Sequence, residues 1–219
     1  SDLNGGGAVH TGTGVFELAT RTAGRAIALG AASTAGQLGF DVSAYGLDAA
    51  TLRIGAINGV ARSSAIDVAG SVNLRAGNAT APNTLDLQTS GAVTQSAGAS
   101  LSVAALTGAV GSLVLGESGN AISTVQDLVA DGGIGLVNSL ALAVNGKAGI
   151  LAGRRGLVPG ATLSLVNGGD LVINGPIGNG GTGTVALSTA GSGNITIANS
   201  GTAVISSAGV LTIAAAGTY

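Results

Sequence analysis

Apolar residues along this chain come mostly in pairs that are separated by a single polar or small residue. Examples are TLRI (51–54), TLDL (84–87), SLVL (112–115), TLSL (162–165) and NITI (194–197). Alternation with a period of two is typical of β-strands that bury one face. Glycine, asparagine or serine interrupts every run, so the pattern predicts many short strands of about four residues.

The pairs form two interleaved series with a spacing of about 21 residues, which is typical of solenoids. The first series contains Leu85, Leu106, Leu128, Ile150, Leu171, Ile195 and Leu211. The second contains Leu74, Val93, Leu113, Ile134, Leu163, Val185 and Val204. A hairpin meander gives no reason for two series to stay in phase, whereas stacked coils require it. We therefore expect an all-β parallel β-helix (β-solenoid) with about 21 residues per coil.

The segment TLSLVNGGDLVING (162–175) tests this interpretation, because an Asn-Gly turn between two alternating runs is also a strong hairpin signal. In a solenoid the two runs are successive sides of one coil, and asparagine and glycine form the corner between them. We expect the second arrangement here. We likewise expect corners without hairpins at the Asn-Gly pairs that begin at Asn58, Asn145, Asn167 and Asn174.

The composition fits a narrow core of aliphatic side chains. The 219 residues include 40 glycines; 46% are hydrophobic, 8% charged and 2% aromatic. A disordered chain carries more charge and fewer apolar residues, so we expect this chain to fold. No apolar run reaches the ~18 residues of a membrane-spanning helix. The slightly acidic balance and the scarcity of aromatic residues argue against a nucleic-acid partner.

Two parts of the chain depart from the repeat. Residues 1–60 have apolar pairs at irregular spacing and contain most of the aromatic residues, which predicts irregular N-terminal coils or a cap. Residues 61–219 carry the regular solenoid repeats. Within them, the longer interval between Ile134 and Leu163 predicts a loop or an extra face around residues 145–160.

Residues 90–146 contain the order G-x-[IV]-T-Q-x-A-G, then L-T-G, then a strand that begins Asn-x-[IV]. This segment, and more loosely the chain to about residue 213, resembles the β-strand repeats of bacterial filamentous-haemagglutinin-like exoproteins and autotransporter passengers. The resemblance implies a right-handed parallel β-helix on the bacterial cell surface. It also implies service as an adhesin, a matrix component or a fibre.

Cleavage of glycosidic bonds uses two carboxyl groups at a set separation, so an enzyme on this scaffold needs clustered acids. Asp67 and Asp86 are the best pair, because each is the middle residue of a predicted strand and they are about one period apart, with Arg53 and Arg75 near. Adjacent coils would place both carboxylates outward and close together. A solvated charged surface is the ordinary role of such residues. We expect no enzymatic activity, and a carbohydrate-active β-helix enzyme is the alternative.

Other chemistry has little support in the sequence. His10 is the only histidine, which argues against a Ser-His-Asp triad or a multi-histidine metal site and predicts a loop residue. Residues 180–187 are similar to the calcium nonapeptide repeat, but Val185 stands at the aspartate position. We expect no metal or cofactor. An ice-binding solenoid is a further alternative, since residues 11–14 and 181–184 hold threonines, although this array does not recur at the coil spacing.

These observations predict a non-enzymatic structural or adhesive solenoid that is secreted to the surface or matrix of a bacterium. An end coil exposes unpaired backbone groups and an open core. We therefore expect copies to stack end to end, or the chain to belong to a longer solenoid. The residues expected at the self-association ends are Phe16, Phe40, Leu211 and Ile213. A glycan or cell-surface receptor is the other partner class, with Arg154 and Arg155 as candidates for glycan contact.

Overall fold

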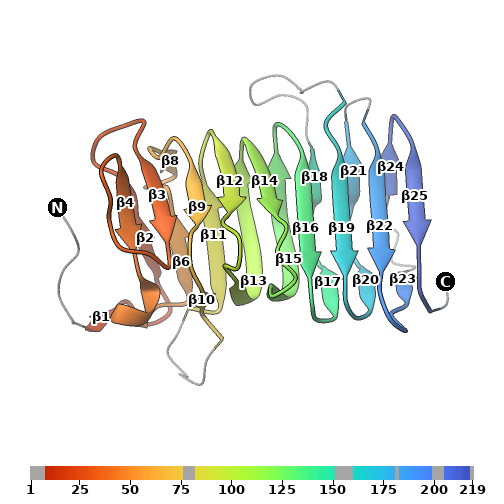
Figure 1. The fold of residues 1–219 in the computed structure, drawn as a ribbon, viewed down its shortest axis with the longest axis horizontal. Helices are drawn as coiled ribbons and strands as arrows, with labels where there is room; N and C mark the ends of the chain where they lie inside the picture. The colour runs from red at the N-terminus through yellow and green to blue at the C-terminus, as the bar shows by residue number, and fades with distance from the viewer. Residues whose placement is uncertain (1–7, 76–81, 151–159, 181–182, 199–204, 218–219) are drawn as a thin grey trace.

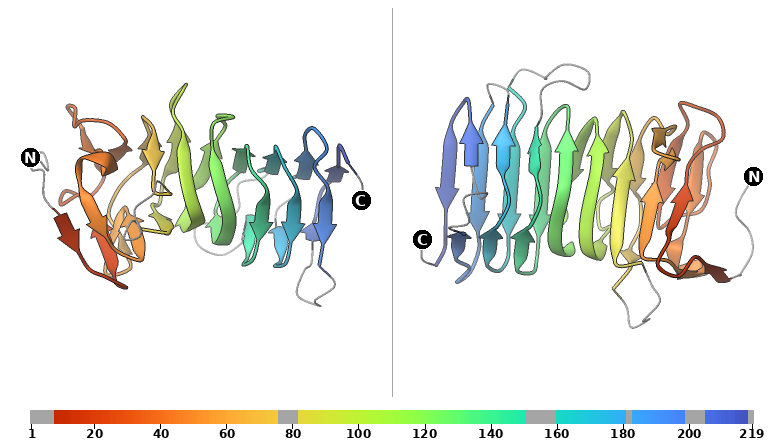
Figure 2. Two further views of the ribbon diagram at one scale, coloured as in Figure 1. Left: turned by 90° about the horizontal axis from the view of Figure 1, so that it is seen from below. Right: turned by 180° about the vertical axis from the view of Figure 1, so that it is seen from behind.

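The protein folds into an elongated stack of short strands. The computed structural model describes residues 8–75, 82–150, 160–180, 183–198 and 205–217. The strands lie side by side along the long axis, and the first and last strands lie at opposite ends (Figures 1 and 2). The described residues contain one short 3₁₀-helix, η1 (Val42–Ala44), so the chain is all-β, as the sequence predicts.

Two long sheets make up most of the molecule, and every strand pair within them is parallel. The nine-stranded sheet has the order β25 (Leu211–Ala214), β22 (Val185–Thr189), β19 (Leu163–Asn167), β16 (Ile134–Asn138), β14 (Ser112–Leu115), β12 (Ala92–Gln95), β9 (Ile66–Val68), β3 (Ala26–Leu29) and β4 (Gln37–Phe40). The twelve-stranded sheet follows the path β2 (Val15–Leu18), β6 (Thr51–Ile54), β11 (Thr84–Gln88), β13 (Leu101–Val110), β15 (Ala121–Ala130), β17 (Leu142–Val144), β20 (Leu171–Ile173) and β23 (Ile195–Ile197). Beside this path it contains β10 (Val72–Asn73), β18 (Ala148–Ile150), β21 (Ile177–Asn179) and β24 (Ile205–Ser207).

The twelve-stranded sheet divides beyond its two longest strands, β13 and β15. The first half of β15 pairs with β17 and the second half with β18, and each branch then continues toward the C-terminal end. At the bend, Gly108 has a φ of 154°, and a Cβ there would lie 2.3 Å from the carbonyl oxygen of Leu87. The opposing bulge in β15 contains Asp127, with a φ of 47°. Only glycine fits at position 108, because the backbone there lies so close to the neighbouring strand that a side chain would clash with it.

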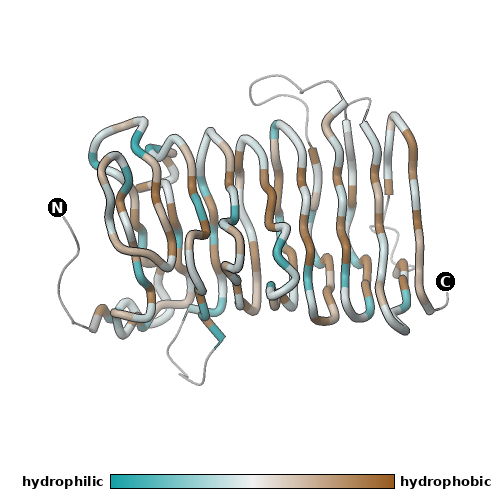
Figure 3. Tube along the Cα trace, in the orientation of Figure 1, coloured by the Kyte–Doolittle hydropathy of each residue, from teal (hydrophilic) through white to brown (hydrophobic). Residues whose placement is uncertain are grey.

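The chain alternates between the two sheets, which answers the question raised by residues 162–175. β19 pairs with β16 in the nine-stranded sheet, and β20 pairs with β17 in the twelve-stranded sheet. The two runs around Asn167 are therefore not a hairpin, and this prediction is confirmed. Most strands of the two sheets bury alternate residues, and hydrophobic positions recur along them (Figure 3). The buried aliphatic side chains form one core cluster between the sheets.

Much of the second predicted series forms one continuous row in the nine-stranded sheet. The register joins Val93, Leu113, Ile134, Leu163 and Val185, all fully or almost fully buried. Side chains of similar size stack in this row because parallel strands in register place equivalent positions about 4.8 Å apart. These five residues of the predicted series are therefore neighbours in one sheet.

Leu211, the last residue of the first series, and Leu74, the first residue of the second, each lie in the sheet of the other series. Leu211 pairs with Val185 in the nine-stranded sheet, not with the first series. The amide of Leu74 donates to Ser102 in the twelve-stranded sheet, not the nine-stranded one. Both sheets show the same alternation, so spacing alone does not distinguish them. Val204 lies outside the described residues.

The first series also slips in register along the twelve-stranded sheet. Leu106 pairs with Val125, whereas the series joins it to Leu128. Leu128 pairs with Gly108, and the one-residue bulge in β15 lies between these two pairings. Leu171 then pairs with Leu142, not with Ile150, because the sheet has divided by that point.

One Asn-Gly pair does form a hairpin, contrary to the prediction. β7 (Ala56–Ile57) pairs antiparallel with β8 (Val60–Ala61), and Asn58-Gly59 makes the two-residue turn. Asn58 has a φ of 50° and Gly59 a φ of 74°, the positive angles that a type I′ turn requires. The short strands on the two sides of this dipeptide pair with one another, so the hairpin that an Asn-Gly pair favours does form here.

The sequence spacing of paired strands is irregular near the N-terminus, where Leu29 pairs with Phe40. Phe16 pairs with Leu52, whereas further along the sheet Leu106 pairs with Val125. A small parallel sheet of β1 (Ala8–His10) and β5 (Gly46–Asp48) adds to the N-terminal end. In the predicted loop or extra face at 145–160, β18 belongs to the twelve-stranded sheet, and residues 151–159 lie outside the described residues.

Candidate functional site

The structure does not bring Asp67 and Asp86 together. Asp67 lies on β9 in the nine-stranded sheet, where Thr94 and Ser96 donate to its two carboxylate oxygens. Asp86 lies on β11 in the twelve-stranded sheet. The prediction of a neighbouring carboxylate pair is wrong, because residues one period apart in number here belong to different sheets.

Asp86 instead belongs to an ionic row that crosses three strands of the twelve-stranded sheet. Register places Glu17 of β2 beside Arg53 of β6, and Arg53 beside Asp86 of β11. The Arg53 guanidinium donates from Nη1 to Glu17 and from Nε to Asp86, each at 2.6 Å. Gln88 donates to the other oxygen of Asp86 at 2.7 Å. Arg75, also expected near the acids, instead donates to the carbonyl of Ala121.

The surroundings of Glu17 and Arg53 favour the charged forms of these two side chains. A hydrogen bond from the backbone amide of Asn58 and then the Arg53 guanidinium lower the pKa of Glu17. The hydrogen bonds to Asp86 and Glu17 raise the pKa of Arg53. Each carboxylate is bound to the same guanidinium, so the geometry is that of a structural salt bridge and contains no acid paired with a free base.

His10 is a strand residue, not the predicted loop residue. It lies on β1 opposite Asp48 of β5, and its Nδ1 lies 3.2 Å from the Asp48 carboxylate. Across the described part of the chain, no three histidine, cysteine or acidic side chains gather in a way that suits a metal ion. Val185, at the aspartate position of the calcium-like stretch, points into the core and is fully buried.

The threonines that suggested an ice-binding array are separated in space. Thr11 and Thr13 lie beside the β1–β5 sheet, where Thr11 donates to Asp48. Thr184 lies far along the stack, beside β19, where its carbonyl accepts from the amide of Leu163. Residues 181 and 182 lie outside the described residues. No face therefore collects these particular threonines.

The N-terminal end of the stack is covered by aromatic side chains. The ring of Phe40 on β4 stacks against Phe16 at 6.2 Å and against Tyr45 at 5.4 Å between ring centroids. Phe40 is only 2% exposed, and Phe16 is partly buried against the core. Phe40 therefore packs inside this aromatic cluster, and self-association at this end, expected at Phe16 and Phe40, stays a prediction.

The C-terminal end of the stack is more open. β23, β24 and β25 each pair with an earlier strand on one side and with no described strand on the other. Leu211 is 46% exposed although it continues the buried row at Val185, and Ile213 is half-buried. This edge presents backbone groups and apolar side chains together. Arg154 and Arg155 lie outside the described residues.

One side of the stack is free of charge over five successive strands. The outward residues of β14, β16, β19, β22 and β25 define what we call the uncharged face: Ser112, Val114, Gly135, Val137, Ser164, Val166, Ala186, Ser188, Thr212 and Ala214. They are small or β-branched and partly to fully exposed. A surface of this kind loses little hydration when another surface covers it.

A buried polar row, which the sequence analysis missed, lines the corner after the strands of the nine-stranded sheet. Register stacks Asn138, Asn167 and Thr189. Asn138 donates to the Asn167 side chain at 2.8 Å and accepts from the amide of Ile122 at 2.7 Å. Asn120, in the same region, accepts from the amide of Leu101. The recurring endings LVN at 138 and LVN at 167 were the available signal.

No family model, no curated protein and no solved structure matches the chain. In the described residues, no helix has the length and hydropathy needed to cross a membrane. The chemistry of the described surface is therefore the basis for any functional conclusion.

Proposed function

We propose that the chain is a right-handed parallel β-helix that serves as a non-enzymatic structural or adhesive element of a bacterial surface or extracellular matrix. The parallel registers, the regular exchange between two sheets and the stacked aliphatic core support the coil architecture. The likeness of residues 90–146 to filamentous-haemagglutinin-like repeats supports the location. Ladder hydrogen bonds run along the long axis, and such a stack resists bending.

The uncharged face is the observation that carries this function. Contact with a cell, a glycan or another copy requires an extended surface from which water can be removed at a small cost in free energy. The outward serines and threonine supply hydroxyl groups, and Val114 and Val166 supply exposed apolar area. By contrast, a glycoside hydrolase would need a carboxylate pair, and Asp67 and Asp86 lie on different sheets.

A lysine on the uncharged face tests the adhesive role. Val114→Lys should reduce binding of the purified protein to cells and glycan-coated surfaces severalfold, because the ammonium group must be desolvated at the contact. Val60→Lys is the matched control, since Val60 on the hairpin is 59% exposed and Val114 is 55% exposed. An equal loss of binding for both variants would contradict the proposal. Cleavage of any glycan on the coated surfaces would contradict it as well.

End-to-end association through β25 is part of the same proposal. The exposed Leu211 and the half-buried Ile213 continue the core row, so a second copy or a further coil is the natural cover for this edge. In sedimentation velocity over a wide concentration range, the wild-type chain should associate and Leu211→Lys should remain monomeric. A monomeric wild type at every concentration excludes this contact.

A further inference from the structure

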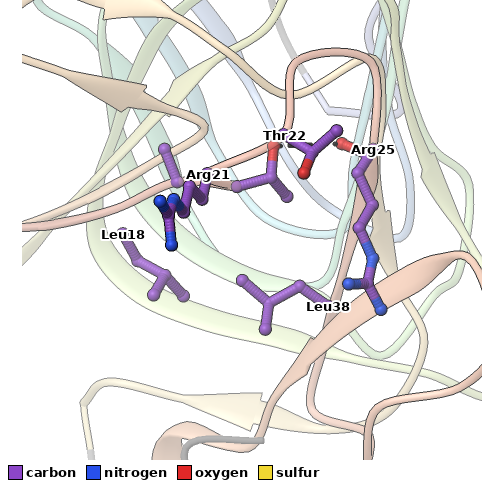
Figure 4. A pocket seen from close by; sticks show the side chains of 7 residues that line it. Leu18, Arg21, Thr22, Arg25 and Leu38 are labelled. Atoms are coloured by element: carbon purple, nitrogen blue, oxygen red, sulfur yellow. Dashed lines mark hydrogen bonds between the residues drawn. The ribbon is translucent and has the colours of Figure 1, made fainter. Parts of the chain in front are cut away.

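A pocket lies at the N-terminal corner of the stack, where the chain passes from β2 to β3. Its volume is about 360 Å³, at the small end of the range for ligand sites. Leu18 and Leu38 form an apolar floor, and the side chains of Arg21 and Arg25 flank it from opposite sides (Figure 4). Thr22 lies at the rim between them. Two cations therefore face one small apolar surface.

The positive charge of this pocket is not balanced by its lining. No acidic residue is among the residues that line it. Glu17, the acid nearest in sequence, is bound to Arg53 and to the amide of Asn58. In the described part of the chain, Arg21 makes no hydrogen bond or ion pair. Two uncompensated guanidinium groups in one pocket favour an anion.

The second cation of the pocket, Arg25, is held in place by contacts within the protein. Its Nη2 donates to the carbonyl of Gln37 at 2.9 Å, which fixes the guanidinium plane against β4. Its Nε is buried and has no hydrogen-bond partner. Because the surface of Nε is closed to solvent, a ligand would contact the rest of the guanidinium group. The Arg25 backbone is held in turn, because its carbonyl accepts from the amide of Ser64.

We propose that this pocket binds a carboxylate or sulfate group carried on a sugar-sized ring. The anion would bind between the guanidinium groups of Arg21 and Arg25, and the ring would lie on Leu18 and Leu38. The exposed hydroxyl of Thr22 would bond to a ring hydroxyl. This site lies at the opposite end of the molecule from β25 and does not depend on the adhesive role of the uncharged face.

Titration followed by NMR, with glucuronate, glucose 6-sulfate and uncharged glucose, tests the site. We expect at least one of the two anions to bind, with amide shifts at residues 18–25 and 38, and we expect no binding of glucose. The two anions show whether carboxylate or sulfate is preferred. Failure of both anions to bind, or equal binding of glucose, overturns the proposal.

Three variants separate this site from general charge attraction. Arg21→Gln and Arg25→Lys should each weaken binding about tenfold, because the first removes a charge and the second keeps the charge but loses the planar fork. Arg75→Gln, which removes an equal charge outside the pocket, should leave the affinity within about twofold. Circular dichroism and melting checks that each variant is folded. A loss with Arg75→Gln equal to that with Arg21→Gln overturns the site.

Discussion

The N-terminal and C-terminal parts of the stack solve the same structural problem with different chemistry. From β1 to β12, aromatic rings cover the end, and an ionic row of Glu17, Arg53 and Asp86 ties three strands together. From β16 onward, a buried row of Asn138, Asn167 and Thr189 occupies the corner. After Asp170 the sequence contains no charged residue at all.

The difference shows which interactions the architecture requires. The nine-stranded sheet runs unbroken through both parts, so its ladder does not depend on charged side chains. What both parts share is the stacked aliphatic core and the parallel strand ladders. Charge is therefore available at one end for binding, and its absence at the other leaves a surface suited to contact. Three substitutions test this division.

The largest effect is expected in the shared core. Leu171→Asp should unfold the C-terminal part or abolish soluble expression, because a carboxylate would be buried without a partner at a cost of more than about 4 kcal/mol. Val172→Asp is the matched control, since the next residue on β20 points outward and is partly exposed. Circular dichroism and melting temperature measure the result. A folded Leu171→Asp protein would show that the core row is not what both parts share.

A smaller effect is expected from the buried amide row. Asn138→Ala should lower the free energy of unfolding by about 2 to 4 kcal/mol, because the amide of Ile122 and the side chain of Asn167 would lose a buried partner. Asn145→Ala is the control, since the Asn145 side chain is exposed and accepts one bond from Asn174. Urea unfolding of both variants compares them. Equal losses would mean that the amide row does not replace the ionic row.

The sequence predicted what alternation and period determine. The alternation of apolar and polar residues predicted strands with one buried face. The spacing of the second apolar series predicted the row from Val93 to Val185. The segment 162–175 was read correctly because the neighbouring strands, and not its own turn, supply the partners for each run. These features follow from stacking, which repeats at every coil.

The features that the sequence did not predict depend on single insertions and on local pairing. One extra residue in β15 shifted the register at Leu128. Asn58-Gly59 formed a hairpin while the same dipeptide at Asn167 did not, because only the former has arms that pair with each other. Asp67 and Asp86 appeared to be neighbours only because a single period was applied to two sheets. No periodic pattern encodes such exceptions.

The smallest expected effect is a pH dependence of stability that arises from the ionic row in the N-terminal part. The amide of Asn58 and the Arg53 guanidinium lower the pKa of Glu17 below its ordinary value of 4.5 in the folded chain. Because the folded pKa is the lower one, this stabilisation is complete above about pH 4.5 and is lost as the pH falls through the folded pKa. We therefore expect acid to weaken the interactions that join β2, β6 and β11.

Glu17→Gln isolates this contribution. At pH 7 the wild type should be more stable than the variant by about 1 kcal/mol or less, as is usual for a partly exposed ion pair. The difference should shrink below pH 4.5, where the wild-type carboxylate gains its proton. Melting temperatures of both proteins between pH 7 and pH 3 measure it. A difference that stays constant over this range would mean that Glu17 acts by packing alone, and the ionic row would then not distinguish the N-terminal part.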